Sequence, residues 1–426
     1  DVYKRQVLVI PGNVALAEIA DDRAVVIERS HPVIVPSGDE LARAATLLNA
    51  SKKTTILAGA GVEGAHDEVI ALADRLGAPI VHALRGKEFI EYDNPFDVGM
   101  TGLLGFASGY RAMEAADTLL VLGSDFPYEQ FYPEHATTIQ VDIRGSQLGK
   151  RHPLDLGLVG DVRATADALL PRLAEKSDRD HLDDSTAHYR KTRAKLDDLA
   201  TPTKAGRPIH PQYLARLLDE QAADDAVFTA DVGSPTVWAA RYLSMTENRR
   251  LIGSFTHGSM ANALLHGIGA QVSHPDRQVI ALAGDGGLAM MLGELLTLTQ
   301  NKLPVKTIVV NNSSLNFVEL EMKAAGFVNY GTALDNPSFA AIAEAMGIFA
   351  RRVENSEDLP DAVREVLAHD GPALLDVVTE RQELSMPPAI EAAQVKGFAL
   401  YAIRTVMSGK GDELLDLARA NWRQFL

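Results

Sequence analysis

The sequence of 426 residues contains no cysteine. This absence excludes disulfides, iron–sulfur clusters, thiolate zinc sites and a cysteine nucleophile, so any metal must have oxygen or histidine ligands. Basic residues are outnumbered: 41 Lys and Arg stand against 57 Asp and Glu, which gives a net charge of −16. Because an acidic surface repels phosphate backbones, we expect no nucleic acid among the partners. No apolar run approaches the roughly 20 residues that a membrane-spanning helix needs.

Two blocks of the sequence alternate short apolar, β-rich runs with helical patterns. The runs lie at 54–58, 79–82, 118–122 and 138–142 in the first block, and at 226–230, 278–283, 305–310 and 373–378 in the second. This alternation predicts the α/β class, with parallel sheets covered by helices. A charged helical stretch at 176–199 and a breaker-rich stretch at 201–208 separate the blocks and predict a domain boundary.

The start of the sequence does not read as the start of a domain. Residues 1–6 are polar and charged, the first residue is not Met, and residues 7–10 are the apolar run Val-Leu-Val-Ile. We predict a strand over residues 7–10. We expect the first six residues to be foreign and the chain to begin inside a domain.

Residues 278–318 contain the most informative pattern. An apolar run ends in Gly284-Asp285-Gly286-Gly287, a helical stretch follows at 288–300, and the next apolar run ends in Asn311-Asn312. A helix of about 13 residues rises roughly 20 Å, enough to carry the chain back along the sheet. Asp285 and Asn312 should therefore meet at the carboxyl ends of neighbouring strands, where ligands bind in open α/β sheets.

These residue types suit a magnesium diphosphate. Glycines beside Asp285 let backbone N–H groups approach an anion at the start of a helix. The Asp285 carboxylate, the Asn312 amide oxygen and a nearby backbone carbonyl are hard oxygen ligands of the kind that Mg²⁺ takes. Gly-Asp-Gly alone is more often a tight turn, but the strand–helix–strand frame and the spacing to Asn312 favour the site.

The paired motif resembles the diphosphate-binding signature of thiamine-diphosphate enzymes. Longer motifs at 92–106, 126–128, 231–241 and 257–262 resemble pyruvate dehydrogenase (quinone), also called pyruvate oxidase. The resemblance implies consecutive parallel-sheet α/β domains of the thiamine-diphosphate-enzyme type with a helical C-terminal tail. The implied parts are a remnant of the pyrimidine-binding domain (1–36), a central FAD domain (37–186), a diphosphate and magnesium domain (187–382) and the tail (383–426).

The resemblance also implies the thiamine-diphosphate site. Asp285, Asn312 and the Ser314 carbonyl would hold Mg²⁺, and Met260 would keep the cofactor bent. Phe317 would assist electron transfer to the flavin, although Met260 and Phe317 could equally be core residues. The residues implied to contact thiamine diphosphate are Gly258, Ser259, Met260, Asp285, Gly286, Gly287, Asn312, Ser313, Ser314, Leu315, Asn316, Phe317 and Val318.

For FAD, the resemblance implies three loops of the central block, with the adenosine end near Arg144. The implied residues are Leu103, Leu104, Gly105, Phe106, Phe126, Pro127, Tyr128, Glu129, Gln130 and Arg144. The segment 59–64, Gly-Ala-Gly-Val-Glu-Gly, matches the dinucleotide fingerprint, but the acidic residue expected about 20 positions later is missing. We therefore expect a tight turn with close helix packing there, not a nicotinamide site. We expect His82, His210 and His257 to be structural rather than acid–base groups.

The tail at 412–426 has an apolar stripe that includes Leu414, Leu417, Trp422 and Phe425. From composition, the stripe could dock on the protein itself or lie at a membrane surface, with docking favoured. The resemblance implies instead that the tail is released on activation and binds lipid. The implied location is cytoplasmic, peripherally associated with the inner face of the cell membrane.

The implied reaction converts pyruvate to acetate and CO2, with electrons passing through FAD to ubiquinone in a homo-oligomer, a tetramer by resemblance. In such enzymes a Glu of the pyrimidine-binding domain activates thiamine diphosphate. Since that Glu is not assigned here, we expect little turnover from these residues alone. Two alternatives remain: a carboligase like acetolactate synthase, and a non-catalytic flavin-binding module.

Overall fold

The computed structural model describes residues 7–18, 30, 32–204, 206–383, 392–407 and 411–421. It divides into two compact units, residues 1–33 and residues 34–426. In the first unit the described residues form one short helix, α1 (Gly12–Ala15). The strand predicted over residues 7–10 is wrong, because this segment is exposed and has no strand. A strand needs a hydrogen-bonded neighbour, and among the described residues none pairs with it.

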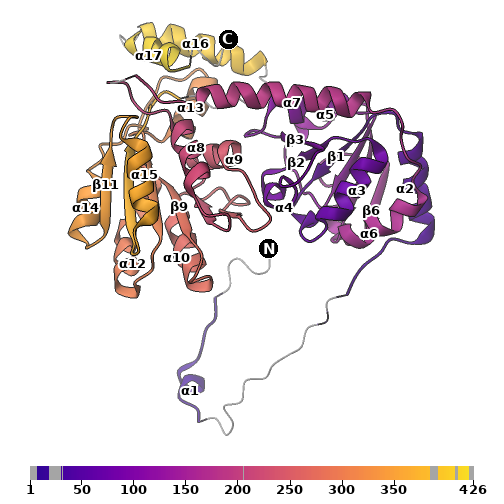
Figure 1. The fold of residues 1–426 in the computed structure, drawn as a ribbon, viewed down its shortest axis with the longest axis horizontal. Coiled ribbons are helices and arrows are strands. Elements are labelled where there is room, and N and C mark those ends of the chain that lie inside the picture. Colours follow the sequence, from indigo (N-terminus) through magenta and orange to yellow (C-terminus); the bar gives the residue numbers. More distant parts are fainter. Residues whose placement is uncertain are drawn as a thin grey trace. The chain divides into compact units, whose positions relative to one another are not determined.

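The second unit contains two parallel six-stranded sheets (Figure 1). The first sheet has the order β3-β2-β1-β4-β5-β6. Its strands are β1 (Thr54–Ala58), β2 (Ile80–His82), β3 (Asp97–Met100), β4 (Thr118–Leu122), β5 (Thr137–Asp142) and β6 (Leu156–Val159). The helices in this part of the chain are α2 (Gly38–Ala50), α3 (His66–Leu76), α4 (Lys87–Ile90), α5 (Ala107–Glu114) and α6 (Val162–Leu169).

The second sheet has the order β11-β12-β10-β9-β7-β8. Its strands are β7 (Val227–Ala230), β8 (Arg250–Ile252), β9 (Val279–Gly284), β10 (Lys306–Asn311), β11 (Phe349–Val353) and β12 (Ala373–Val378). Its helices are α8 (Pro211–Gln221), α9 (Ser234–Tyr242), α10 (Ala263–Ser273), α11 (Asp285–Met290), α12 (Leu295–Asn301), α13 (Asn316–Ala324), α14 (Phe339–Ala345) and α15 (Leu359–Ala368). The prediction of consecutive parallel-sheet α/β domains is confirmed.

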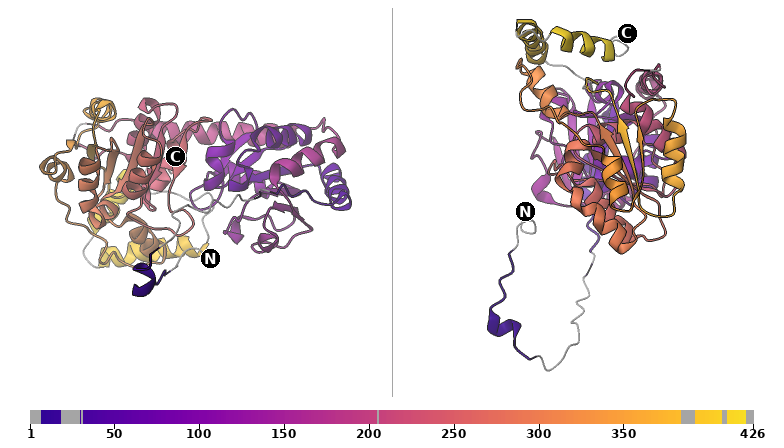
Figure 2. Two further views of the ribbon diagram at one scale, coloured as in Figure 1. Left: turned by 90° about the horizontal axis from the view of Figure 1, so that it is seen from below. Right: turned by 90° about the vertical axis from the view of Figure 1, so that its left-hand side faces the viewer.

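Helices cover both faces of each sheet, as Figure 2 shows. In β9, Ile280 and Leu282 belong to the apolar cluster formed with α8, α9 and α15, whereas Val279 and Ala281 belong to the cluster formed with α10, α12 and α14. Successive side chains of a strand point to opposite faces, so a strand covered on both sides is apolar at nearly every position. This is why the inner strands are continuous apolar runs in the sequence.

The eight predicted apolar runs correspond to the eight inner strands, and the four strands not predicted are the edges β3, β6, β8 and β11. An edge strand pairs on one side only, so it tolerates shorter and more polar sequence. Arg351 and Arg352 of β11, for example, are exposed.

The single helix predicted at 288–300 is interrupted. Met291 leaves the helical conformation, at φ −125° and ψ 27°, between α11 and a short 3₁₀ turn that leads into α12. Leu288, Leu295 and Leu298 nevertheless all belong to the same apolar cluster.

Helix α7 (Asp180–Leu199) contacts both sheet domains, and the domain limit predicted after residue 186 falls inside it. On one side, the ring of Tyr189 lies 6.2 Å from that of Phe106, centroid to centroid. On the other, Arg193 Nη1 donates to the carbonyl oxygen of Arg241 (2.5 Å). Helix α7 therefore connects the two sheet domains through side-chain contacts with each. The domain limit after residue 186 stays a prediction.

Two helices, α16 (Ala392–Met407) and α17 (Gly411–Asn421), represent the tail in the described part of the chain. Arg404 Nη1 donates to Gly326 O (2.6 Å), and Asn421 Nδ2 donates to Gln382 O (2.7 Å). Trp422 and Phe425 of the predicted stripe lie outside the described residues. None of the helices in the described ranges combines the length and the apolar character needed to cross a membrane.

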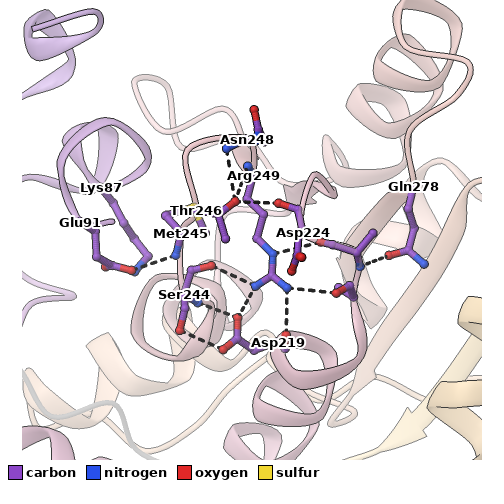
Figure 3. Close-up of polar contacts among 12 residues, drawn as sticks. Lys87, Glu91, Asp219, Asp224, Ser244, Met245, Thr246, Asn248, Arg249 and Gln278 are labelled. Atoms are coloured by element: carbon purple, nitrogen blue, oxygen red, sulfur yellow. Dashed lines mark hydrogen bonds and ion pairs between the residues drawn. The ribbon is translucent and has the colours of Figure 1, made fainter. Parts of the chain in front are cut away.

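Arg249 organises the junction between the two sheet domains (Figure 3). Its buried guanidinium donates to Asp219 Oδ1 (2.7 Å) and to the backbone carbonyls of Asp219, Ala222, Ala223 and Ser244. These bonds satisfy carbonyls at the C-terminal end of α8 and fix the loop that follows α9. Next in that loop, the Met245 N–H donates to Glu91 Oε1 of the first domain (3.1 Å).

Replacing Arg249 by methionine should lower the free energy of unfolding by about 3 kcal/mol, because it removes the charged partner of Asp219 and the donor of four part-buried carbonyls. Urea denaturation followed by circular dichroism measures this change. The matched control is Arg364→Met, which removes an exposed pair with Asp361 and should change stability by less than about 0.5 kcal/mol. Equal effects of the two variants would contradict this role of Arg249.

Candidate functional site

The Gly-Asp-Gly and Asn-Asn segments meet at the carboxyl edge of the second sheet. β9 and β10 are parallel neighbours, with Val310 opposite Gly284. Asp285 begins α11, and its carboxylate accepts hydrogen bonds from the N–H of Gly286 (2.8 Å) and the N–H of Ser313 (2.6 Å). The two segments thus lie side by side at the strand ends, as their spacing predicts. The roles of Asp285 and Asn312 as metal ligands stay predictions.

One side-chain amide, that of Asn336, also orients this carboxylate. Asn336 Nδ2 donates to Asp285 Oδ2 (2.8 Å) and to Asn311 Oδ1 (3.0 Å). Asn312 is buried, and its Oδ1 accepts from the Ser314 N–H (3.1 Å). Asn336 lies far beyond the signature in sequence, so the motif gave no signal for it.

The donor set fits a divalent cation. Asp285 is only 3% exposed, and burial raises its pKa in spite of the N–H donors and Asn336. A cation at the carboxylate favours the ionised form that burial disfavours. One carboxylate and one amide oxygen at the start of a helix are ligands that Mg²⁺ accepts when phosphate oxygens and water complete its shell.

The loop after β8 comes close to this helix start. A Cβ atom built on Gly286 would lie 3.3 Å from Met260 Cε and 3.1 Å from Leu315 Cδ2, so both side chains lie over Gly286. Gly258, Ala261 and Ser313 all have positive φ, at 69°, 61° and 54°. For Ala261 and Ser313 this conformation is strained, and such strain concentrates at functional sites.

Asp231, at the end of β7, ties the site together. Its Oδ1 accepts from the Ala263 N–H (2.8 Å) and its Oδ2 from the Gly284 N–H (3.0 Å). Burial raises the pKa of Asp231. Gly287 packs against it so closely that a Cβ there would lie 2.1 Å from Asp231 Oδ2. The sequence motif containing Asp231 was recognised, but not this anchoring role.

Behind the Asn-Asn loop, Glu319 holds α13 in place. Its carboxylate accepts from Ser314 Oγ (2.6 Å) and Lys323 Nζ (2.8 Å). Burial would raise the pKa of Glu319, but Lys323, with help from Ser314 and Arg381, lowers it to about 2. Glu319 is therefore ionised and fixes the position of Ser314.

The remaining predicted residues of this loop point in different directions. Asn316 Nδ2 donates to Arg381 O (3.1 Å), and Val318 is 48% exposed. Phe317 packs against the apolar cluster on the α8, α9 and α15 face of the second sheet. Its role in electron transfer stays a prediction.

The first domain has a cavity of about 770 Å³ along the carboxyl edge of its sheet. Of the residues implied to bind FAD, the lining includes Leu103, Leu104, Phe126, Pro127, Tyr128 and Arg144. It does not include Gly105, Phe106, Glu129 and Gln130. Phe106 is buried instead in a small cluster with Met100 and with Ala240 of α9.

The glycine segment at 59–61 lines the same cavity. The sequence predicts close helix packing here, but the close contacts are with the loop after β4: a Cβ on Gly59 would lie 2.4 Å from Gly123 O and one on Gly61 would lie 2.6 Å from Gly123 Cα. Because these glycines have no side chains, the loops after β1 and β4 can pack against each other, and their backbone can border the cavity.

The three histidines have separate surroundings. His82 is fully buried, and burial lowers its pKa to about 4. Its Nε2 lies 3.6 Å from Glu91 Oε2 and 3.5 Å from Asp97 Oδ1. His210 Nδ1 lies 2.6 Å from Glu383 Oε2, and His257 is exposed in the loop before Gly258.

Comparisons with known proteins agree with this geometry. The thiamine pyrophosphate enzyme C-terminal TPP binding domain matches residues 231–377, and the thiamine pyrophosphate enzyme central domain matches residues 41–169. YdaP of Bacillus subtilis, a putative thiamine pyrophosphate-containing protein, is 34% identical over 97% of this chain and 73% of its own length. The chain belongs to the thiamine pyrophosphate enzyme family. The residues predicted to hold magnesium and the diphosphate lie within the matched C-terminal domain.

Other relatives in this family share shorter stretches. An uncharacterized 42.6 kDa protein of Pseudomonas amyloderamosa is 53% identical over 48% of this chain and 52% of that protein. A probable acetolactate synthase large subunit of Methanococcus aeolicus is 28% identical over 84% of this chain. The chain spans 63% of that synthase and 53% of acetolactate synthase 1 of Nicotiana tabacum.

Adding one methyl group at Gly287 should damage the thiamine-diphosphate site. In Gly287→Ala the new Cβ would displace the Asp231 carboxylate and loosen Gly284, so we expect magnesium-dependent affinity for thiamine diphosphate to fall by about 10–100-fold. Calorimetric titration measures the affinity. The matched control is Gly269→Ala, in α10, where a Cβ meets nothing within 4 Å. An unchanged affinity in Gly287→Ala would refute the anchoring role of Asp231.

The acidic cluster at His82 predicts a pH effect on stability. Burial, with Glu91 nearby, raises the pKa of Asp97 to about 7. Above that pH the folded protein must bury an ionised carboxyl, and below it the carboxyl is protonated. Asp97→Asn should therefore raise the free energy of unfolding by about 1–2 kcal/mol near pH 8, with a smaller gain near pH 5.

Urea denaturation at a series of pH values checks this expectation. Asp361→Asn, at a carboxyl that is 74% exposed, is the control and should show no such trend. A gain from Asp97→Asn that does not depend on pH would show that the ionisation of Asp97 does not limit stability.

Proposed function

We propose that the protein oxidatively decarboxylates pyruvate to acetate and CO2 with thiamine diphosphate, Mg²⁺ and FAD, and that ubiquinone is the final electron acceptor. One water is consumed and the quinone is reduced to the quinol, so that atoms and electrons balance. The observation that supports this best is the cavity of about 770 Å³ in the first domain, whose lining extends to Phe255 and Thr256, just before Gly258–Met260. The loop that carries the predicted thiamine-diphosphate residues 258–260 thus also lines this cavity.

The place of the cavity in the fold and its lining residues support a flavin dinucleotide as its ligand. It runs along the carboxyl ends of parallel strands, the position at which dinucleotides bind in α/β sheets. Glycine backbone at 59–61, Arg85, Arg144 and Arg151 line it, and these groups suit a diphosphate and an adenosine. Its volume lies within the range of roughly 300–1,000 Å³ found for ligand pockets.

When bound, thiamine diphosphate supplies the electron sink for decarboxylation, and the flavin accepts the electron pair. The residues of the chain supply binding and orientation. Asp285 and Asn312 would hold Mg²⁺, and the N–H groups at the start of α11 would face the diphosphate. Met260 and Leu315, which lie over Gly286, would exclude water and fix the cofactor above that glycine.

A carboligase like acetolactate synthase is the second candidate. The relatives named acetolactate synthase share 27–30% identity with this chain. In this alternative, two pyruvates give one acetolactate and one CO2 without net oxidation, so a bound flavin undergoes no redox change. The two proposals therefore differ in products and in the need for an acceptor.

The partners and location follow from the same proposal. We propose that the protein is a homo-oligomer, that it is cytoplasmic, and that its tail binds lipid at the inner face of the cell membrane. The proposal for the tail rests on α17, where Leu414 and Leu417 are only half-buried and so leave part of their apolar side chains open to a lipid surface.

The full-length gene product, loaded with the three cofactors, tests the proposal. With pyruvate and a quinone analogue we expect acetate and reduced quinone in equal amounts. Without an acceptor, the flavin should become reduced and stay so. Asp285→Ala should lower the rate at least about 100-fold through loss of the metal. Acetolactate as product, with an oxidised flavin, would support the carboligase and contradict the oxidative reaction.

A further inference from the structure

We propose that Phe255 is a positioning residue for the isoalloxazine ring of FAD, so that the diphosphate domain completes the flavin site of the central domain. This inference rests on the proposed function, since it requires a flavin in the cavity. Phe255 and Thr256 are the cavity residues that come from the second sheet domain in the described part of the chain.

Phe255 belongs to an apolar wall, which we define as Leu84, Leu104 and Phe255. All three line the cavity. All three also pack against the apolar cluster of the second sheet that contains α8, α9 and α15. The wall is therefore continuous with the core of the diphosphate domain.

Sheet topology shows which end of the cavity is apolar. Leu84 follows β2 and Leu104 follows β3, at one end of the first sheet. At the other end, Asp142 is the last residue of β5, Arg144 follows β5 and Asp161 follows β6. A flavin dinucleotide has the large isoalloxazine ring at one end, the diphosphate in the middle and the more polar adenosine at the other end. The match places the ring against the apolar wall, where offset or edge contacts with Phe255 stabilise it.

Contacts with Gly253 and Arg241 of the second sheet domain fix the positions of Phe255 and Leu104. A Cβ on Gly253 would lie 2.4 Å from Phe255 Cε1, so the Phe255 ring rests directly on that glycine. Arg241, buried in α9, donates from Nε to Leu104 O (3.0 Å) and from Nη2 to Gly105 O (3.3 Å). The positions of Phe255 and Leu104 thus both depend on the diphosphate domain.

The same loop reaches the thiamine-diphosphate site. Asn262 binds both of its ends, because its Oδ1 accepts from the Ser254 N–H (3.1 Å) and its Nδ2 donates to Ser259 O (2.5 Å). Met260 follows directly and lies over Gly286. If a bound cofactor displaces Met260, it also displaces the segment 254–259, which Asn262 holds at both ends and which contains Phe255. We expect binding of thiamine diphosphate to alter the surroundings of the flavin ring.

Flavin titration of the 426-residue chain tests the proposal without turnover. FAD is added with and without thiamine diphosphate and Mg²⁺, and affinity is read from flavin fluorescence and ring environment from visible circular dichroism. Phe255→Ala should weaken FAD binding about tenfold and abolish the change in the flavin spectrum on adding thiamine diphosphate. Phe255→Leu, which keeps an apolar contact, should recover part of the affinity.

Phe349→Ala is the matched control. Phe349 is also half-buried and packs against the same apolar cluster, but it lies on the edge strand β11 and does not line the cavity. It should leave FAD affinity and the spectral response unchanged. Thermal unfolding of each variant separates loss of folding from loss of binding.

The outcomes are distinct. Weaker binding and a lost response in Phe255→Ala, with a normal control, support the proposal. Wild-type affinity and an unchanged spectral response in both Phe255 variants overturn it and leave the proposed function standing. If the wild-type chain binds thiamine diphosphate with Mg²⁺ but no FAD, the flavin function and this inference both fall.

Discussion

The buried carboxylate of Asp285, fixed where two parallel strands end, is the interaction on which the site depends. Its position follows from the crossover between β9 and β10, and its orientation from the N–H groups of Gly286 and Ser313 and the amide of Asn336. Burial makes its negative charge costly, so the folded chain holds a group that gains from a cation. Asp231 and Met260 lie against the glycines at 284–287, at the same helix start.

The inner architecture was predictable from sequence because it obeys local rules. A strand covered on both faces is largely apolar, so the inner strands stand out as runs, and the signature from Gly284 to Asn312 lies at the ends of two of them. The edge strands were not predictable, because they pair on one side only and their sequences, such as Phe-Ala-Arg-Arg-Val in β11, show no such run. Conversely, residues 7–10 looked like a strand and are not one.

In the site, the sequence indicated the residues that lie within motifs and missed those that act across the fold. Asn336 orients Asp285, Glu319 fixes Ser314, and Phe255 reaches the cavity of the other domain, but nothing local distinguishes these residues from core or surface positions. Arg241 shows the same limit. It stood inside a recognised motif, yet its bonds to Leu104 and Gly105 join segments more than a hundred residues apart.

We propose that thiamine diphosphate and a flavin bind on either side of the loop between β8 and α10, which Asn262 holds in place. An experimental structure of the chain with thiamine diphosphate, Mg²⁺ and FAD tests it most directly. The account predicts a metal on Asp285 and Asn312, and a flavin ring against Leu84, Leu104 and Phe255. A flavin bound elsewhere, or a metal away from Asp285, would contradict it.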